Sequence, residues 1–327
     1  MPDAPSIDEL RALRQRLGPR ILRTPVMRCA KLEQHLGGTT RVIGKLEFLQ
    51  HTGTFKARGA LAVISSMNAE QRAAGVTAVS AGNHAIATAF AARTAGTSAK
   101  IVMIGSANPA RVAECCRYGA ELVFADDVHE AFTMVERIQQ EEGRFFVHPF
   151  EGREIAAGTG TVGLEICEDV ADFDAIVVPV GGGGLLGGIA GAVRQLRPGC
   201  EIIGVEPEGA DSMHRSFAAG EPQSIAQVTT IADSLGAPFA LPYSFGLCQD
   251  NVDRLALVDD HQLRIAMGLL FRDMKIAVEP ACAATTAALL GPLRESLRGK
   301  TVVLVFCGSN IDWESFAAQA VFEEAEC

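Results

Sequence analysis

Lys56 lies in the segment Gln50–Gly59, where a lysine near the start of a helix can act as an imine-forming amine. The apolar periodicity of Phe55–Met67 predicts a helix with Thr54 as its N-cap. The positive end of a helix dipole disfavours a second positive charge, which lowers the pKa of Lys56 and leaves more free amine for attack on a carbonyl. A solvated surface lysine is the alternative, so a catalytic role requires partners elsewhere in the chain.

A glycine loop is the second candidate for chemistry, since Gly181–Gly184 follow the apolar run Ala175–Val180 and open another helix. Four consecutive glycines let the backbone approach a ligand closely, and their N–H groups at a helix N-terminus can bind a phosphate without Lys or Arg. A tight turn is the alternative, but it needs fewer glycines. The loop therefore predicts a phosphate site.

The same loop also fits a dinucleotide. Gly182, Gly184 and Gly187 satisfy the pattern G-x-G-x-x-G, and Glu206 ends the next strand about twenty residues further on, where an acid that binds a ribose would lie. A nicotinamide-dependent oxidoreductase therefore stays open as an alternative, although it leaves Lys56 unexplained.

A second junction between a strand and a helix carries Ser80, Asn83 and His84. The helix N-terminus there can bind an anion such as a substrate carboxylate, and helix capping by Ser80 or Asn83 is equally compatible with the pattern. We assign no proton transfer to His84, because a lone histidine is more often packed or solvated.

A third junction follows Thr301–Phe306, where Cys307 ends a buried strand. The thiol is either a core group or a neutral hydrogen-bonding group beside a ligand at the same sheet edge as the glycine loop. It has no evident histidine and acid nearby in sequence, so a papain-like nucleophile is a poor interpretation.

The elements that must position these residues alternate between short β-branched runs and Ala-rich helical stretches, which predicts an α/β fold with mostly parallel sheets flanked by helices. Helices are expected at His84–Thr94 and Leu186–Gln195, and Arg153–Asp174 reads as a helix and its approach. The predicted strands are Thr77–Val79, Lys100–Ile104, Leu122–Phe124, Ala175–Val180, Ile202–Val205 and Thr301–Phe306.

Composition restricts the class of protein. With 327 residues the chain can bury a large core and form two domains. The net charge of −10 and the pI near 5.3 argue against nucleic acid as a partner. The sequence shows neither a secretory signal nor an apolar run long enough to span a membrane, so we expect a cytoplasmic protein. The nine cysteines are scattered without metal-like spacing, which favours reduced thiols.

Taken together, the segments resemble the fold-type II pyridoxal-phosphate enzymes (the tryptophan synthase β-like fold), and within them the threonine/serine dehydratase (ammonia-lyase) and serine racemase group. The resemblance covers nearly the whole chain, and the ordered set of motifs is far more specific than any one of them. The motifs are Lys45–Ala60, Ser80–His84, His148–Phe150, Gly158–Thr161, Gly181–Leu185, Gly204–Pro207, Ile231–Asp233, Glu279–Pro280 and Cys307–Asn310.

This resemblance implies roles for the candidate residues toward pyridoxal 5′-phosphate. Lys56 would form the Schiff base and act as the base for the Cα proton, Phe55 would pack against the pyridine ring, and Asn83 would donate to its phenolic oxygen. Cys307 would face the pyridine nitrogen, and Glu279 joins the cofactor-binding set. The implied phosphate site is Gly181, Gly182, Gly183, Gly184 and Leu185, and the implied substrate-carboxylate site is Ser80, Ala81, Gly82, Asn83 and His84.

Two departures from the family pattern sharpen the prediction. Racemases carry a serine as the opposite-face base where this chain has Ala81, which cannot exchange a proton, so we expect elimination rather than racemisation. Relatives also bind a mono- or divalent cation through ligands that map onto Glu206, Ala210 and Ser212. Ser212 is neutral, which weakens that site.

We therefore predict a lyase that removes water and then ammonia from a β-hydroxy amino acid such as L-threonine or L-serine. Loss of the β-hydroxyl is expected over transamination, because a neutral thiol at the ring nitrogen leaves the carbanion less delocalised. The alternatives are a 3-hydroxyaspartate dehydratase, a dehydratase of a bulkier hydroxy amino acid, a β-replacement enzyme, an oxidoreductase that binds NAD, and an inactive cofactor-binding regulator.

The expected organisation has two domains. Residues 1–50 and 149–327 would form a large cofactor-binding domain, and residues 51–148 a small substrate-binding domain. By resemblance the chain is expected to form a homodimer, and it ends too soon after Cys307 to hold the regulatory domain of biosynthetic threonine dehydratases.

Overall fold

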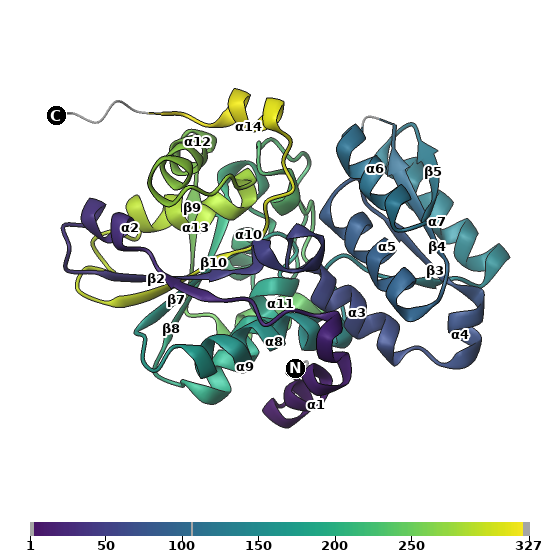
Figure 1. The fold of residues 1–327 in the computed structure, drawn as a ribbon, viewed down its shortest axis with the longest axis horizontal. Coiled ribbons are helices and arrows are strands. Elements are labelled where there is room, and N and C mark those ends of the chain that lie inside the picture. The colour runs from purple at the N-terminus through teal and green to yellow at the C-terminus, as the bar shows by residue number, and fades with distance from the viewer. Residues whose placement is uncertain (1–2, 106, 323–327) are drawn as a thin grey trace.

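Two separate sheets organise the chain in the computed structural model, which describes residues 3–105 and 107–322 (Figure 1). The larger sheet has six strands in the order β1-β2-β10-β7-β8-β9, and the smaller sheet has four in the order β5-β4-β3-β6. Every paired strand is parallel to its neighbour except β1, which runs antiparallel to β2. The predicted α/β fold with two mostly parallel sheets is confirmed.

The strands of the larger sheet are β1 Val26–Arg28, β2 Arg41–Leu46, β7 Ala175–Pro179, β8 Glu201–Pro207, β9 Arg254–Val258 and β10 Thr301–Phe306. Those of the smaller sheet are β3 Val76–Val79, β4 Ala99–Ile104, β5 Glu121–Ala125 and β6 Phe145–Phe146. The α-helices are α1 Ile7–Leu17, α2 Ala30–His35, α3 Lys56–Ser66, α4 Ala69–Ala74, α5 Asn83–Ala95, α6 Pro109–Arg117, α7 Val128–Glu142, α8 Arg153–Asp169, α9 Gly184–Leu196, α10 Ser212–Ala219, α11 Pro242–Asn251, α12 Asp260–Leu269, α13 Pro280–Leu290 and α14 Trp313–Gln319.

All six predicted strands are present, but four strands were not predicted. Of these, β2 includes Lys45, a charged residue that breaks the apolar pattern and is fully buried because its amine donates to Glu165 at 2.6 Å. The other three give weak patterns, because β6 has two residues, β1 is an edge strand with two exposed residues, and β9 is only partly buried.

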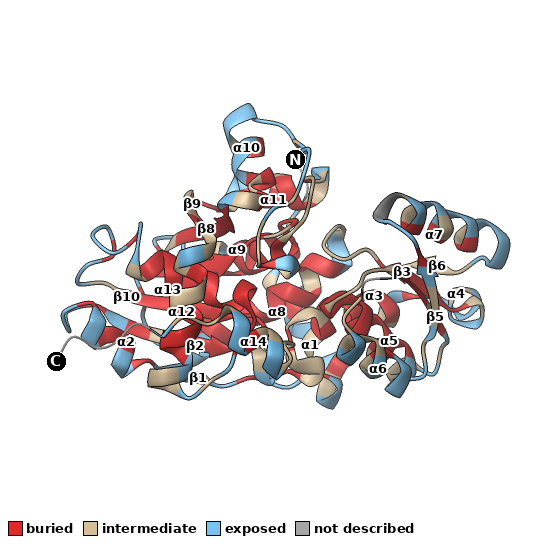
Figure 2. Cartoon of the chain, turned by 90° about the horizontal axis from the view of Figure 1, so that it is seen from above, coloured by how far each residue is buried: buried red, intermediate tan, exposed pale blue. Residues whose placement is uncertain are grey.

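Helices with buried small residues form the centre of the larger lobe (Figure 2). A Cβ added at Gly188 of α9 would lie 2.6 Å from the carbonyl oxygen of Ala156, and one at Gly163 of α8 would lie 2.8 Å from that of Ile189. Real side chains do not fit at such distances. The glycines therefore let α8 and α9 pack backbone against backbone, which holds the start of α9 in place.

The helix that carries Lys56 begins one residue later than predicted, and its N-cap is Phe55 rather than Thr54. Thr54 is instead drawn into extended backbone by an antiparallel bridge to Gly308. The amide of Phe55 donates to the carbonyl of Cys307 at 3.1 Å. This pairing, which local sequence does not reveal, brings the Lys56 and Cys307 segments side by side.

A buried ion network anchors the first turn of α3. The Arg58 guanidinium donates to Glu47 at 2.8 Å and to Glu165 at 2.8 Å, and all three side chains are fully buried. Lys45 completes the network on the other oxygen of Glu165. The network ties α3 to α8 and to the end of β2, and so it fixes the backbone two residues after Lys56.

Within residues 3–105 and 107–322, no helix has both the length and the apolar character that a membrane span needs. The eight cysteines in this part of the chain are free thiols, and Cys327 lies outside the described residues.

Candidate active site

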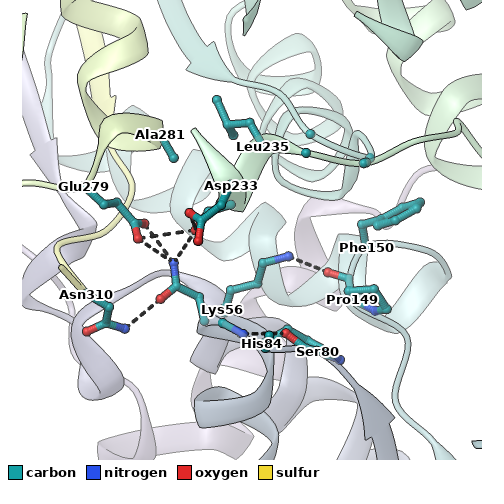
Figure 3. Close-up of a pocket in the computed structure, with 18 of the residues that line it drawn as sticks. Lys56, Ser80, His84, Pro149, Phe150, Asp233, Leu235, Glu279, Ala281 and Asn310 are labelled. Atoms are coloured by element: carbon teal, nitrogen blue, oxygen red, sulfur yellow. Dashed lines mark hydrogen bonds between the residues drawn. The ribbon is translucent and has the colours of Figure 1, made fainter. Parts of the chain in front are cut away.

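A pocket of about 600 Å³ opens between the two sheets at the carboxyl ends of their strands (Figure 3). Its wall includes Val79 at the end of β3, Pro179 at the end of β7 and Cys307 after β10. The carboxyl edges of parallel strands present loops and helix N-termini, which is why ligands bind there in open α/β sheets.

Lys56 projects into this pocket from the first residue of α3, and its Nζ donates to the carbonyl oxygen of Pro149 at 2.6 Å (Figure 3). The Nζ also lies 5.3 Å from the ring centroid of Phe55. Burial lowers the pKa of Lys56 to about 8, against opposing contributions from Cys307 and Glu279. The predicted lowering is therefore present, but its main cause is desolvation of the amine in the pocket rather than the helix dipole.

The carbonyl that accepts from Lys56 belongs to a turn held by His148. The Nδ1 of His148 accepts from the amides of Phe150 at 3.2 Å and Glu151 at 2.9 Å. Burial lowers the pKa of His148 to about 4, so the ring stays neutral and keeps this acceptor. The sequence motif His148–Phe150 marked this turn, but nothing in it indicated a contact with Lys56.

The glycine loop approaches its neighbours too closely for any other residue. A Cβ at Gly182 would lie 2.3 Å from the Phe150 ring, and one at Gly184 would lie 2.4 Å from the Phe150 carbonyl oxygen. Gly183 has φ +89°, a left-handed conformation that favours glycine. The loop opens α9 with no side-chain cap, which leaves the first amides of that helix for a ligand.

The buried side-chain amide of Asn83 belongs to a chain of hydrogen bonds. Its Nδ2 donates to both carboxylate oxygens of Glu279, at 2.8 and 3.0 Å, and its Oδ1 accepts from Asn310 at 2.8 Å. Burial raises the pKa of Glu279 to about 7. The helix-capping interpretation of Asn83 and Ser80 is wrong, because α5 has Gly82 as its N-cap and no side-chain cap bond.

Ser80 and His84, at the two ends of the Ser80–His84 loop, have different hydrogen-bond partners. The Ser80 hydroxyl accepts from the amide of Gly82 at 3.1 Å, which tightens the loop. His84 is buried, and its Nε2 donates to the carbonyl of Val147 at 2.7 Å. Burial lowers the pKa of His84 to about 3, so the ring is neutral and the absence of a proton-transfer role agrees with its environment.

Cys307 is buried and lines the same pocket. Its hydrogen bond with Cys282 and its burial raise the pKa of Cys307 well above the usual range. The group at this position is therefore a neutral thiol.

All the residues predicted to bind cofactor or substrate line this one pocket: Phe55, Lys56, Ser80, Ala81, Gly82, Asn83, His84, Gly181, Gly182, Gly183, Gly184, Leu185, Glu279 and Cys307. Their segments are far apart in the sequence, so only the fold brings them together.

The suggested cation ligands Glu206, Ala210 and Ser212 do not line the pocket. The Glu206 carboxylate accepts the amides of Met213 at 2.9 Å and His214 at 2.7 Å, and burial raises its pKa to about 8. In the described ranges, no three His, Cys, Asp or Glu side chains gather as a metal site. These two contacts attach the Glu206 carboxylate to the first turn of α10.

Sequence reasoning missed several lining residues that α6, α7 and the C-terminal segment contribute. They include Asn108 and Arg111 of the α6 region, Phe132 of α7, and Asp312 before α14. No motif marks these residues. Asp233 and Asn310 also line the pocket, and each lay within a motif of the family resemblance without a role of its own.

A buried amine of lowered pKa faces a glycine loop that can bind a phosphate, at the shared carboxyl edge of two parallel sheets, and this defines an α/β enzyme site for a phosphorylated carbonyl cofactor. The chain belongs to the family described as pyridoxal-phosphate dependent enzyme, whose model matches residues 17–308. The predicted resemblance is thereby confirmed.

Relatives and solved structures agree with this family. The chain is 52% identical to phenylserine dehydratase of Ralstonia pickettii over 313 residues, which cover 96% of this chain and 95% of that protein. It is 35% identical to the catabolic L-threonine dehydratase of Escherichia coli K12, with 94% and 93% of the two chains covered. Maize serine racemase superimposes with a TM-score of 0.92 at 33% identity, and 97% of each chain is covered.

The residues present fit pyridoxal phosphate. The glycine loop has no room for a Cβ at Gly182 or Gly184 and offers uncapped amides to the phosphate, and Lys56 supplies an amine in the same pocket. Phe55 and Cys307 also line this pocket. The pocket therefore has an amine for the aldehyde, backbone amides for the phosphate, and an aromatic ring and a thiol for the pyridine ring.

Proposed function

We propose that this chain is a pyridoxal-phosphate-dependent ammonia-lyase that removes water and then ammonia from a β-hydroxy amino acid, leaving a 2-oxo acid. The observation that carries the proposal is the pairing of the Lys56 amine with the glycine loop in one pocket, in a chain 52% identical to a phenylserine dehydratase. The E. coli relative named a threonine dehydratase supports the same reaction class.

The reaction needs a carbonyl carbon that binds the amine and a ring that withdraws electrons from Cα, and pyridoxal phosphate supplies both when it is bound. Lys56 is proposed to hold the cofactor at Nζ and, once released, to take the Cα proton. A pKa of about 8 suits this role, because roughly a tenth of the amine is neutral at pH 7, against well under about a thousandth for an ordinary lysine. The carbonyl of Pro149, 2.6 Å away, orients the Nζ.

Further roles are proposed for the residues that surround Lys56. Gly181–Gly184 with Leu185 would hold the phosphate, and Phe55 would pack on the pyridine ring. The loop Ser80–His84 would bind the substrate carboxylate through its backbone amides. Asn83 would donate to the phenolic oxygen of the cofactor, which requires that one of its N–H groups leave Glu279.

The neutral Cys307 favours elimination in this proposal. A thiol whose pKa lies well above its usual range donates weakly and does not protonate the pyridine nitrogen as an aspartic acid would. The electrons at Cα are then withdrawn less strongly, so departure of the β-hydroxyl is favoured over the slow reprotonation that transamination needs.

Ala81 supports elimination over racemisation. It lines the pocket within the carboxylate loop and has no group that can exchange a proton. We expect Ala81→Ser to introduce measurable inversion at Cα while the wild type shows none, as followed by chiral chromatography of unreacted substrate. Inversion by the wild type at a rate comparable to elimination would contradict this role.

The proposed substrate has an apolar β-substituent, with an aryl group first and threonine or serine next. The lining residues include Phe132, Phe150 and Phe239, which can pack on a ring. A second carboxylate, as in 3-hydroxyaspartate, would face three acidic lining residues, while the cations of the described lining are Lys56 and Arg111. The acidic lining residues are Asp233, Glu279 and Asp312.

One set of assays tests the function. The purified protein should be yellow, and Lys56→Ala should lose the borohydride-reducible linkage to the cofactor. Phenylserine, threonine, serine and 3-hydroxyaspartate are then assayed for 2-oxo acid and ammonia, and we expect the fastest release from phenylserine. No release from any of them, with turnover of an acylated serine in the presence of sulfide, would indicate β-replacement, and a colourless protein that binds NAD would refute the proposal.

A cation site stays a separate proposal, with Glu206, the carbonyl of Ala210 and Ser212 as ligands. The two hydrogen bonds that Glu206 accepts from backbone amides already compensate part of its negative charge, which argues for weak binding of a cation. Thermal unfolding of the holoenzyme in potassium, magnesium or chelator measures this, and identical transitions in all three would exclude the site.

The domain organisation is also proposed rather than established. Residues 1–50 and 149–327 would form the large cofactor-binding domain, and residues 51–148 the small substrate-binding domain. Support comes from the sheets, since β3 to β6 pair only with one another in the described structure. We further propose a cytoplasmic homodimer, and light scattering coupled to size-exclusion chromatography would test its mass.

A further inference from the structure

Arg111 lies against the loop that is proposed to bind the substrate carboxylate. It projects from α6, in the lobe of the smaller sheet, and lines the pocket. A Cβ built on Gly82 would lie 3.3 Å from Arg111 Nη1 and 3.8 Å from Cζ. The guanidinium therefore covers the loop at the N-terminus of α5.

The hydrogen bonds of the Arg111 guanidinium do not use all of its N–H groups. Its Nη1 donates to Asp233 at 2.5 Å and its Nη2 donates to the carbonyl of Asn310 at 3.3 Å. Glu279 lies 3.9 Å from Nη2, beyond hydrogen-bond distance. An arginine has five N–H groups, so three have no acceptor among residues 3–105 and 107–322. The Arg111 side chain is nevertheless only 15% exposed.

The charges of the pocket favour a cation beside an anionic ligand. The described lining holds the carboxyl groups of Asp233, Glu279 and Asp312, and Lys56 is reserved for the cofactor. An α-carboxylate bound by backbone amides alone would face net negative charge. Arg111 is the remaining cation of that lining, and it lies at the loop itself.

We propose that Arg111 is a second anchor for the substrate α-carboxylate, which its free N–H groups bind beside the amides of the Ser80–His84 loop. This rests on the proposed function, because that function assigns the carboxylate to this loop. Every amino-acid substrate uses the same anchor whatever its β-substituent.

A purely mechanical role is the competing explanation. Arg111 joins α6 to the Asp233 loop, and Asn108 at the start of α6 donates to Asp312 at 2.6 Å, so both contacts could simply hold the two lobes together. The two explanations differ in what the ligand must carry. An anchor acts only on ligands with a carboxylate, whereas a clasp between lobes acts on all ligands alike.

The experiment uses the holoenzyme and two ligands without a β-hydroxyl, L-alanine and L-alaninamide, whose dissociation constants are read from the absorbance of the bound cofactor. For Arg111→Met we expect the dissociation constant of L-alanine to rise about tenfold or more, as for loss of a charged hydrogen bond, and that of L-alaninamide to stay within about twofold. Arg111→Lys should lie between the wild type and Arg111→Met. Asp233→Asn should not weaken L-alanine, because it removes a competitor for the guanidinium.

If Arg111→Met weakens L-alanine and L-alaninamide equally, or if Asp233→Asn weakens L-alanine as much as Arg111→Met does, the clasp explains the data and the anchor is overturned. An unchanged dissociation constant of L-alanine in Arg111→Met would also overturn the anchor. Circular dichroism and cofactor content check that each variant is folded and loaded. The result is independent of elimination: a protein that binds L-alanine through Arg111 but dehydrates no hydroxy amino acid would refute the proposed reaction and keep the anchor.

Discussion

Gly184→Ala tests the requirement for close backbone contact at the proposed phosphate site. The added Cβ would lie 2.4 Å from the carbonyl oxygen of Phe150, 2.9 Å from its Cα and 3.0 Å from its carbonyl carbon. All three are backbone atoms, so no side-chain rotation relieves the overlap. The 148–151 turn or the start of α9 must move, and Lys56 depends on that turn through the carbonyl of Pro149.

Overpacking of this kind costs about 1–3 kcal/mol in protein interiors. We expect a loss of that size in the unfolding free energy of the cofactor-free protein, measured by urea denaturation. Moving the phosphate-binding amides should also weaken pyridoxal phosphate by about tenfold or more, since tenfold corresponds to roughly 1.4 kcal/mol. Titration of the cofactor-free protein, followed by cofactor absorbance, gives the dissociation constant.

Gly191→Ala in the same helix is the matched control. Its added Cβ meets only Cβ of Ala4, at 3.3 Å, and Ala4 lies in irregular backbone before α1 that can shift by a few tenths of an ångström. Alanine in a helix interior is favoured over glycine by about 0.5–1 kcal/mol, so stability should change little or rise. Wild-type stability and cofactor affinity in Gly184→Ala, or equal losses in both variants, would refute the reasoning.

Three further predictions address other parts of the chain. The rate at which cofactor-free protein binds pyridoxal phosphate should rise with pH, with a midpoint near 8 rather than 10.5, because burial lowers the pKa of Lys56 and only the neutral amine attacks the aldehyde. Stopped-flow absorbance measures this rate, and a midpoint near 10.5 would contradict the effect of burial on Lys56. Arg58→Met should cost about 3–5 kcal/mol of unfolding free energy, since it leaves Glu47 buried without its cationic partner and leaves Glu165 with Lys45 alone. A loss under about 1 kcal/mol in urea denaturation would argue against the network. Brief iodoacetamide treatment of the folded protein should label Cys116, the exposed cysteine of the described chain, and spare Cys307, as peptide mass spectrometry would show.

The sequence predicted the elements whose patterns are local. Buried parallel strands such as β7 and β10 are near-continuous apolar runs, so the local pattern was enough to predict them and to place the glycine run at the end of β7. The strand β2 was missed for the opposite reason. Its Lys45 is tolerated inside the sheet only because Glu165, 120 residues away, supplies the compensating charge.

By itself the sequence determined which residue types are available: a lysine near a helix start, a run of four glycines, the loop Ser80–His84 and a cysteine after a buried strand, in the order of one enzyme family. The tertiary structure decided how they act. Desolvation in the pocket lowers the pKa of Lys56, a bridge between Thr54 and Gly308 brings that lysine beside Cys307, and α6 places Arg111 over the carboxylate loop. Each of these depends on distances between segments far apart in the chain, and no local pattern of residues encodes such distances.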